Sequence, residues 1–434
     1  MDDEFWQLAR AFIATDTALP RGNTGLEPLV RQALAPLAGG RLTLLPAEHA
    51  GARHFNYLAS FGPDAPGGLL LVTHLDTVPA GPLERWTTPP HTLHREGGRV
   101  RGLGVADVKL DYLCKVFALR ALDLGRLRLP VRLLGTFCEE VGLVGARHFA
   151  QTHLAHIKPD WVLCGEPSEL LPCPAHKGYT AVRVSVPSTG PQQEALVKER
   201  KFAGKAAHSS TPHLGDNAIL RMLDALDGPV ARVSGGSSLN TVPASAEATL
   251  ADAATGTAAS FVDLTPALGI LRQAYATWCA LATALDPRTA PDFDPATVVN
   301  NWGRIGSDGA TVWGEFDARL LPEHDPLKLI EAFTATTQLQ IDVLRDNPGM
   351  RAQATSRLLP ALSRVLTAMG RDATPRAKPT STEAGVFARA GYDAAVTGPG
   401  VSVGNAHTAN EWNTEADLEA AVELYRRLTL ELCG

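Results

Sequence analysis

The chain has 434 residues, of which 45% are hydrophobic and 20% charged, and its formal net charge is -6 at pH 7. This length exceeds what one ordinary hydrophobic core accommodates and predicts two or three compact units. The apolar content excludes a disordered chain, and the lack of a Lys/Arg-rich block argues against electrostatic binding to nucleic acid. We therefore expect small-molecule partners.

The N-terminus and the cysteines indicate the compartment. Residues 2–4 are acidic where a secretory signal needs basic residues, and no apolar run reaches the roughly 20 residues that a membrane span requires. We expect a cytoplasmic protein without membrane contact. The six cysteines stand far apart without a Cys-x-x-Cys pair, which predicts buried free thiols.

The first part of the chain alternates strand-like and helix-like segments, a pattern typical of a largely parallel sheet covered by helices. Short, continuous apolar runs at residues 68–73, 131–138 and 161–164 predict strands that are buried on both faces. Residues 394–397 form a similar run near the end of the chain. Between the first two runs, residues 109–123 carry apolar side chains at helical spacing, which predicts a crossover helix.

From about residue 179 the pattern changes to alternation of apolar residues with period two, as in residues 182–186 and 312–320. Such alternation is typical of a sheet with one solvated face. We therefore predict an inserted, smaller α+β domain over residues 179–323. The catalytic domain would comprise residues 1–178 and 324–434, with helices on both faces of a mixed, largely parallel sheet.

The chain closes with a predicted helix over residues 415–432, whose apolar side chains recur at helical spacing. Thr414 and Asp417 have the spacing of a capping box at its start. We find no internal repeat or low-complexity segment.

Polar residues follow the predicted strands directly. His74 and Asp76 form a His-x-Asp stretch, in which one imidazole nitrogen can bind a metal while a carboxylate orients the ring. Glu139 and Glu140 end the next strand, where two adjacent buried carboxylates repel each other unless a cation offsets them. One of two such carboxylates can bind a metal while its neighbour accepts a proton.

Asp107, Glu166 and His407 lie in three further loops, and each alone is ordinary loop chemistry. Gly102 and Gly104 half-resemble a dinucleotide fingerprint, but Asp107 occupies the third glycine position and would repel a pyrophosphate. Taken together, the strand ends supply oxygen and nitrogen ligands that suit two divalent ions. The candidate ligands are His74, Asp107, one of the pair Glu139 and Glu140, Glu166 and His407.

With these motifs in this order, the sequence resembles the M20 metallopeptidase family over essentially the whole chain, and in particular its acetylornithine deacetylase, succinyl-diaminopimelate desuccinylase and aminoacylase branch. The motifs that carry the resemblance are His-x-Asp-x-Val-Pro at 74–79, Gly-Leu-Gly-x-Ala-Asp-x-Lys at 102–109, Glu-Glu-x-Gly at 139–142, Gly-Glu-Pro-Ser at 165–168 and Gly-x-x-x-His-Ser-Ser at 204–210.

The resemblance implies two Zn²⁺ ions per subunit, for which Co²⁺ can substitute. His74 and Glu166 would each bind a different ion. Glu140 and His407 would complete the two sites, and Asp107 would bridge the ions. The resemblance also implies a homodimer that forms through the inserted dimerisation or lid domain.

Further roles follow from the same resemblance. Glu139 would be the general base, and Asp76 would steady the metal-binding histidine. His208 would reach the partner subunit's active site and help to hold the developing oxyanion, although nothing in its local sequence marks it. Asn240 and Arg319 would hold the substrate carboxylate, whereas the alternation around Arg319 by itself predicts a solvent-facing side chain.

Two local stretches favour the acetylornithine deacetylase side of the family: Ala-His-Lys-Gly at 175–178, and Ser-Thr-Glu-Ala at 381–384, where many relatives have Asp in place of Glu383. The implied reaction is hydrolysis of the amide bond of an N-acyl amino acid, which releases an acyl carboxylate and a free amino acid. Succinyl-diaminopimelate desuccinylation, N-acetyl-lysine deacetylation and dipeptidase or carboxypeptidase activity on short peptides stay open, because such enzymes share the metal core.

Two departures from the family pattern bear on the substrate. Leu110 replaces the glycine that usually follows the Asp-x-Lys stretch, and residues 190–202 add length ahead of His208. A non-catalytic metal-binding homologue stays open as an alternative from another class. A nucleotide-dependent oxidoreductase is disfavoured by the acidic residue in the glycine loop. We also expect no nucleophile elbow of a serine hydrolase.

Overall fold

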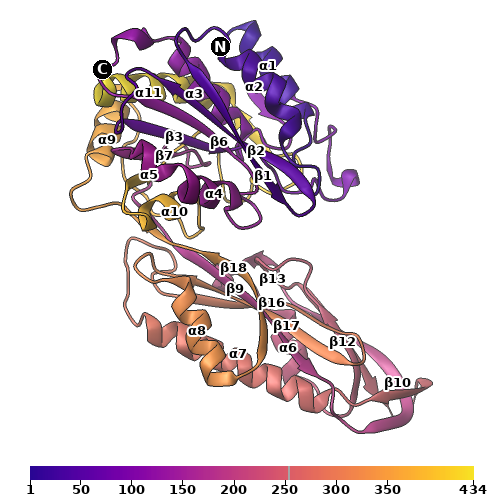
Figure 1. The fold of residues 1–434 in the computed structure, drawn as a ribbon. Helices are drawn as coiled ribbons and strands as arrows, with labels where there is room; N and C mark the ends of the chain where they lie inside the picture. The colour runs from indigo at the N-terminus through magenta and orange to yellow at the C-terminus, as the bar shows by residue number, and fades with distance from the viewer. Residues whose placement is uncertain (253–254) are drawn as a thin grey trace. The chain divides into compact units, whose positions relative to one another are not determined.

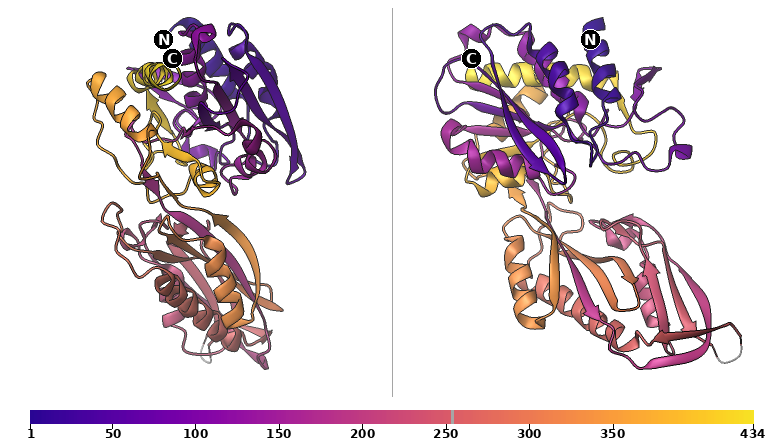
Figure 2. Two further views of the ribbon diagram at one scale, coloured as in Figure 1. Left: turned by 60° about the vertical axis from the view of Figure 1, so that its left-hand side comes forward. Right: turned by 45° about the vertical axis from the view of Figure 1, so that its right-hand side comes forward.

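The computed structural model describes residues 1–252 and 255–434, which form two compact units. Unit 1 comprises Met1–Ala175, Met350–Ala377 and Thr382–Gly434, and unit 2 comprises His176–Gly349 and Lys378–Ser381 (Figure 1). Both chain ends belong to unit 1 (Figure 2). Among the helices of the described residues, none has the length and apolar character needed to cross a membrane.

Unit 1 is built on a six-stranded sheet with the strand order β1-β2-β6-β3-β7-β20. The strands are β1 (Arg41–His49), β2 (Ala52–Phe61), β6 (Val131–Thr136), β3 (Leu69–His74), β7 (Trp161–Cys164) and β20 (Asp393–Val396). The last four run parallel, whereas β1 and β2 form an antiparallel pair at one edge. Every residue of these four parallel strands is buried, as their continuous apolar runs predict.

Helices cover both faces of this sheet, which confirms the predicted fold class (Figure 1). One face packs against a core with side chains of α1 (Asp3–Ala14), α2 (Glu27–Leu34), α3 (Lys109–Arg120), α9 (Leu358–Ala368) and α11 (Glu415–Cys433). The other face packs against α4 (Val144–Thr152), α5 (Leu154–Ile157) and α10 (Ala384–Arg389). Half of the predicted capping box is present: the Thr414 hydroxyl accepts a hydrogen bond from the Asp417 backbone N–H at 3.0 Å, whereas the Thr414 backbone N–H donates to Asn413 Oδ1 at 2.8 Å.

Smaller elements complete unit 1. A three-stranded sheet has the order β21-β5-β4, and short 3₁₀ helices lie in the loops. Their bounds are β4 (His94–Glu96), β5 (Arg99–Arg101), β21 (Trp412–Thr414), η1 (Thr24–Leu26), η2 (Leu83–Arg85) and η3 (Leu124–Arg126). A further two-stranded pair joins β8 (Ala175–His176) to β19 (Met350–Arg351).

The six cysteines are free thiols, and all except the partly exposed Cys279 are buried, as predicted.

Unit 2 is an eight-stranded antiparallel sheet with the order β15-β10-β14-β12-β16-β17-β9-β18. The strands are β9 (Gly178–Pro187), β10 (Gln192–Ala203), β12 (Val230–Gly235), β14 (Ser245–Ala251), β15 (Thr257–Val262), β16 (Val299–Ser307), β17 (Thr311–Leu320) and β18 (Gln340–Asn347). The helices α6 (Ala218–Asp224), α7 (Thr265–Leu285) and α8 (Pro326–Thr337) share one hydrophobic core with the sheet, and a small pair joins β11 (Ala207–His208) to β13 (Thr241–Val242).

The extent of unit 2 differs from the predicted insertion over residues 179–323. Strand β18 pairs with β9 across Val343 and Val182, so α8 and β18 belong to unit 2, which runs to Gly349. The predicted return to the catalytic domain at residue 324 is therefore wrong by one helix and one strand. Residues 190–202, which depart from the family pattern, lie mainly in β10.

Candidate metal centre

The parallel strands of unit 1 bring the predicted ligands to one edge of the sheet. His74 is the last residue of β3, and its register partner on β6 is Thr136, just ahead of Glu139 and Glu140. Glu166 stands two residues beyond the end of β7, which pairs in parallel with β3. Because parallel strands end at the same edge, these side chains meet at their carboxyl ends, where open α/β sheets place their ligand sites.

Asp107 lies at the centre of the cluster, two residues before helix α3. Its Oδ1 atom lies 3.1 Å from Nε2 of His74, and its Oδ2 atom lies 3.2 Å from Nε2 of His407. Oε1 of Glu166 lies 3.9 Å from Nε2 of His74, and Oε1 of Glu140 lies 3.0 Å from Nε2 of His407. The two oxygens of Asp107 therefore face two separate groups, each with one imidazole and one further carboxylate.

This grouping differs from the one that the resemblance implied. We expected His74 and Glu166 to serve different ions, but the distances place them together on one side of Asp107. Glu140 and His407 lie together on the other side. The bridging position of Asp107 agrees with the expectation.

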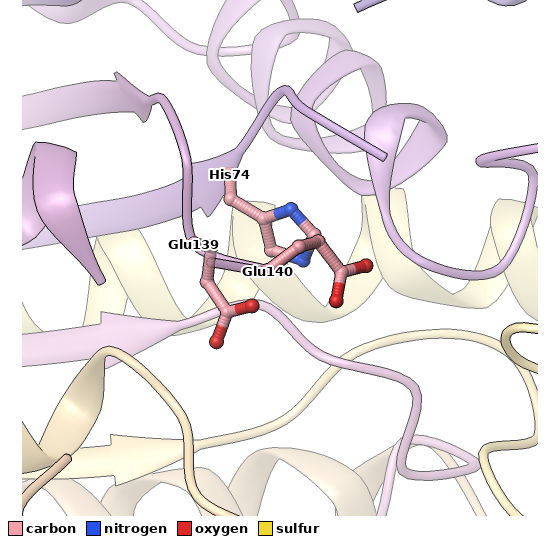
Figure 3. A group of neighbouring side chains, drawn as sticks. All are labelled: His74, Glu139 and Glu140. Carbon is pink, nitrogen blue, oxygen red and sulfur yellow. The ribbon is translucent and has the colours of Figure 1, made fainter. Parts of the chain in front are cut away.

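Glu139 lies beside these ligands but is not one of the residues in the two groups that face Asp107. His74, Glu139 and Glu140 each offer a ligand atom within 4.8 Å of the other two, and their side chains lie side by side (Figure 3). Asp107, Glu140 and His407 form a second such group. His74 and Asp107 are buried, whereas His407 has a side-chain exposure of 38%, so the cluster opens on the side of His407.

Asp76 acts on the backbone of the Glu139–Glu140 turn. Its carboxylate accepts hydrogen bonds from the backbone N–H of Glu139 at 3.0 Å and of Glu140 at 3.2 Å. Its Oδ1 atom lies 3.6 Å from Nδ1 of His74, and its backbone oxygen lies 3.2 Å from the same nitrogen. Asp76 thus orients both the imidazole and the acidic pair.

The electrostatics of the cluster show an excess of negative charge. Burial raises the pKa of Glu139 well above its usual range, and the carboxylates of Glu166 and Glu140 raise it further, while His74 opposes the shift. The Glu140 carboxylate raises the pKa of His407 well above its usual range. Burial alone would lower the pKa of His74, but hydrogen bonds to Asp107 and Asp76 outweigh burial and raise it.

A further carboxylate adds to this excess. Burial raises the pKa of Glu383 to about 7, in a position where the charges of Asp76 and Glu166 also act on it. Carboxylate and imidazole groups in such excess are the ligands that divalent ions of the Zn²⁺ type prefer, and a bound cation offsets their mutual repulsion. The donor set therefore fits the implied metal ions.

Sequence reasoning missed the role of Glu411. Its carboxylate is buried and accepts hydrogen bonds from three backbone N–H groups, those of Gly104 at 3.2 Å, Ala106 at 2.7 Å and Asp107 at 3.0 Å. Glu411 therefore orients the loop that carries Asp107. It follows His407 by four residues in the sequence, but no local rule marks it as a partner of a loop about 300 residues away.

The candidates of unit 2 gather around Ser209, a fully buried residue to which we had assigned no role. Its backbone N–H donates to the backbone oxygen of Asn240 at 2.9 Å, and its hydroxyl accepts from Nη2 of Arg319 at 3.0 Å. His208 is the preceding residue and lies exposed at the end of β11. Only the Gly-x-x-x-His-Ser-Ser motif signalled this residue in the sequence.

Arg319 is 3% exposed, so the expectation of a solvent-facing side chain from alternation alone is wrong. The guanidinium lies 3.6 Å from the ring centroid of Tyr179 on the neighbouring strand β9. The Nε of Arg319 and the hydroxyl of Tyr179 are both buried without a hydrogen-bond partner among the described residues. Buried donors of this kind call for an acceptor, and an anionic group supplies one.

The ring of His208 has a defined acceptor side. The backbone N–H of Ser210 donates to its Nδ1 atom at 3.1 Å. A neutral ring that accepts from this N–H carries its proton on Nε2, and the Ser210 hydroxyl, 2.7 Å from the same Nδ1 atom, can then donate to Nδ1 as well. His208 can therefore present Nε2–H as a hydrogen-bond donor.

We expected no Gly-x-Ser-x-Gly motif of a serine nucleophile elbow, and this expectation is wrong, because the sequence contains one such motif. Residues 400–404 read Gly-Val-Ser-Val-Gly. In the structure this stretch lies in the loop between β20 and β21, with no helix directly after it. A nucleophile elbow needs a tight turn from a strand into a helix, so the motif lacks its structural context.

Comparisons with known proteins agree on one family. A family model described as peptidase family M20/M25/M40 matches residues 70–431. An acetylornithine deacetylase of Pasteurella multocida (strain Pm70) is 39% identical over 228 residues, which is 51% of this chain and 54% of that protein. The alignment therefore spans about half the length of this curated relative.

Several solved structures share the fold of this chain. An aminoacylhistidine dipeptidase from Vibrio alginolyticus has a TM-score of 0.67 at 16% identity, over 99% of this chain and 96% of that chain. An M20 family metallo-carboxypeptidase from Sulfolobus solfataricus has a TM-score of 0.64 at 19% identity, over 99% of both chains. At these identities the likeness extends to the fold alone.

Proposed function

Because this chain belongs to peptidase family M20/M25/M40 and is a metal-dependent hydrolase of amides or peptides, we propose that it deacylates an N-acyl amino acid, as an acetylornithine deacetylase does. The observation that carries the proposal is the position of Asp107, whose two oxygens face two groups of imidazole and carboxylate. The 39% identical acetylornithine deacetylase supports the choice of substrate class.

We propose that two Zn²⁺ ions bind at this cluster. His74 and Glu166 would hold one ion, Glu140 and His407 would hold the other, and Asp107 would bridge them; these pairings follow the distances of 3.9 Å and 3.0 Å between imidazole and carboxylate. Bound ions of this type act as Lewis acids that polarise a carbonyl and make water more acidic.

Glu139 is the proposed general base. Its carboxylate would take a proton from the attacking water and return it to the nitrogen of the leaving amine, so that the amide and water become an acyl carboxylate and a free amine. The hydrogen bond from the Glu139 backbone N–H to the Asp76 carboxylate holds the backbone of Glu139 in place. A raised pKa suits a group that accepts and then donates a proton near neutral pH.

The residues of unit 2 have proposed roles at the substrate. His208 would donate a hydrogen bond from Nε2 to the developing oxyanion, since Ser210 occupies Nδ1. Arg319 and Asn240 would hold the substrate carboxylate, a task for which a planar guanidinium is well suited. Two further predictions are a homodimer that forms through unit 2, with His208 acting in the partner's site, and a cytoplasmic location. Light scattering tests the first prediction, and cell fractionation tests the second.

The decisive experiment measures amine release from a panel of substrates by the Zn²⁺-loaded and the Co²⁺-loaded protein. The panel contains N-acetylornithine, N-acetyllysine, N-succinyl-diaminopimelate and several dipeptides. We expect the highest kcat/KM for N-acetylornithine. A higher value for a dipeptide or for the succinyl compound would replace the substrate, and bound metal without turnover of any compound would support a non-catalytic homologue.

A further inference from the structure

A fully buried ion pair lies directly behind the ligand cluster and has no part in the proposed reaction. Lys115 and Asp111 stand one helical turn apart on α3, and both side chains are 0% exposed. The Lys115 ammonium donates to Asp111 Oδ2 at 2.6 Å, to Thr73 Oγ1 at 2.7 Å and to the backbone oxygen of Val72 at 2.7 Å. All three of its N–H donors are therefore used inside the protein.

The Asp111 carboxylate is equally saturated. Its Oδ2 atom accepts a second hydrogen bond from the Thr73 hydroxyl at 2.6 Å, and its Oδ1 atom accepts one from the Tyr425 hydroxyl of α11. The Tyr425 hydroxyl also lies 3.3 Å from the backbone oxygen of Thr397, just beyond β20. One network thus ties helices α3 and α11 to the ends of two parallel strands.

Two glycines show how closely the ligand-bearing loops pass over the pair. A Cβ atom at Gly165 would lie 1.8 Å from Asp111 Oδ2 and 2.5 Å from Lys115 Nζ. A Cβ atom at Gly398 would lie 2.6 Å from the backbone oxygen of Glu166 and 3.3 Å from Asp111 Oδ1. The loop after β7 therefore rests on the ion pair without any intervening side chain.

The network touches the residues adjacent to two of the proposed metal ligands. Thr73 directly precedes His74, and Gly165 directly precedes Glu166. Val72, the acceptor for Lys115, also accepts the hydrogen bond of the Gly165 backbone N–H at 2.8 Å, which joins the ends of β3 and β7. Asp107 precedes by two residues the start of α3, the helix that carries Asp111 and Lys115.

We infer that Asp111 and Lys115 form a positioning pair that holds His74 and Glu166 at the separation needed for one metal ion; this inference rests on the proposed metal site. Stability alone does not account for the pair, because desolvation offsets much of the attraction in a buried ion pair and apolar side chains of similar volume often replace it without loss. The pair instead defines the direction in which two strand ends leave the sheet. Partners that orient metal ligands in this way commonly contribute a factor of about 10–100 in metal affinity.

The test separates positioning from stability with paired variants. Lys115→Met leaves a buried unpaired carboxylate and is expected to lower the thermal midpoint of the metal-free protein strongly. The double variant Asp111→Leu/Lys115→Met is expected to recover most of that loss. Its Co²⁺ affinity, measured by competition with a chelator, should nevertheless fall by about 10–100-fold, and the visible absorption spectrum of bound Co²⁺ should change.

A control variant on the opposite side of α3 calibrates the effect of lost stability. Leu113 is fully buried in the core of unit 1, so Leu113→Ala is expected to lower the midpoint while the Co²⁺ affinity and spectrum stay unchanged. If the double variant fails to fold, Tyr425→Phe removes one hydrogen bond from the network at constant shape and should weaken Co²⁺ binding in the same direction.

Two outcomes would overturn the inference for different reasons. An unaltered Co²⁺ affinity and spectrum in the folded double variant, or in Tyr425→Phe where that is the folded variant, would reduce the pair to a structural feature. Absence of Co²⁺ binding by the unsubstituted protein would overturn the proposed metal site itself, and the inference with it. Weaker binding together with an altered spectrum, absent from Leu113→Ala, supports positioning.

Discussion

The two units each hold a cluster of buried polar side chains, and the clusters differ in composition: carboxylates predominate in unit 1, whereas unit 2 pairs one guanidinium, Arg319, with one carboxyl, Asp317. In unit 1, carboxylates outnumber imidazoles around Asp107, and their mutual repulsion adds to the raised pKa of Glu139. In unit 2, the buried guanidinium of Arg319 presents an Nε donor without a partner among the described residues, next to Ser209.

The difference indicates what each cluster is able to bind. An excess of buried carboxylate favours cations, whereas unpartnered buried donors favour an anion such as a carboxylate. The fold matches this division, because parallel strand ends concentrate acidic residues at one edge in unit 1, while unit 2 places its arginine within an antiparallel strand.

The largest expected effect comes from removing the proposed proton acceptor of the cation-binding cluster. Glu139→Gln should lower kcat by about 10²–10⁴-fold, because general-base catalysis contributes a factor of that order, while metal content stays unchanged. Elemental analysis and steady-state kinetics measure the two quantities. Glu140→Gln is the matched control and should lose metal, so equal metal loss in both variants would contradict the division of roles.

The second prediction concerns Asp317, a buried carboxyl on strand β17, two residues before Arg319. Burial raises the pKa of Asp317 to about 6 from an ordinary value of 3.8, although Arg319 opposes the shift. Because the folded pKa is raised, this carboxyl contributes stability that is fully present below about pH 3.8 and is lost as the pH rises through about 6. The contribution is at most about 3 kcal/mol.

Asp317→Asn removes this titration. Between pH 4 and 7, the unsubstituted protein should therefore lose stability in unit 2 relative to the variant. Amide hydrogen exchange in β16 and β17, compared between the two proteins at each pH, measures the difference. A constant difference across this range would show that Asp317 does not titrate there.

A smaller effect is expected when the Asp107 loop loses its orientation. In Glu411→Gln the side-chain amide nitrogen cannot accept from a backbone N–H, so one of the three hydrogen bonds to the loop is lost. The Co²⁺ affinity should fall by about tenfold, at the lower end of the range for residues that orient metal ligands. Chelator competition measures it, and an unchanged affinity would assign Glu411 to loop folding alone.

An effect of similar size, confined to KM, is expected at the proposed anion site. Arg319→Lys should raise KM for an N-acyl amino acid by about tenfold with little change in kcat, because an ammonium cannot reproduce the planar fork of a guanidinium. The substrate whose carboxylate is converted to an amide provides the control. The variant and the unsubstituted enzyme should turn it over alike, and an equal rise in KM for both compounds would exclude recognition of the carboxylate.

Much of unit 1 was predictable because its signals are local. Continuous apolar runs identified the parallel strands, since a strand covered on both faces has no polar side, and Thr414 identified the start of α11. The residues after each strand were recognisable as one group, because parallel strands end at a common edge.

Other features depend on contacts between distant segments, which only the tertiary structure decides. The pairing of β18 with β9 extends unit 2 to Gly349, and packing against Tyr179 buries Arg319 despite its alternating sequence. The residues and motifs of the metal centre were thus set by the sequence itself. The grouping of its ligands around Asp107, and the ion pair of Asp111 with Lys115 beneath them, arise only when strands and helices far apart in the chain come together, because their geometry depends on several segments at once.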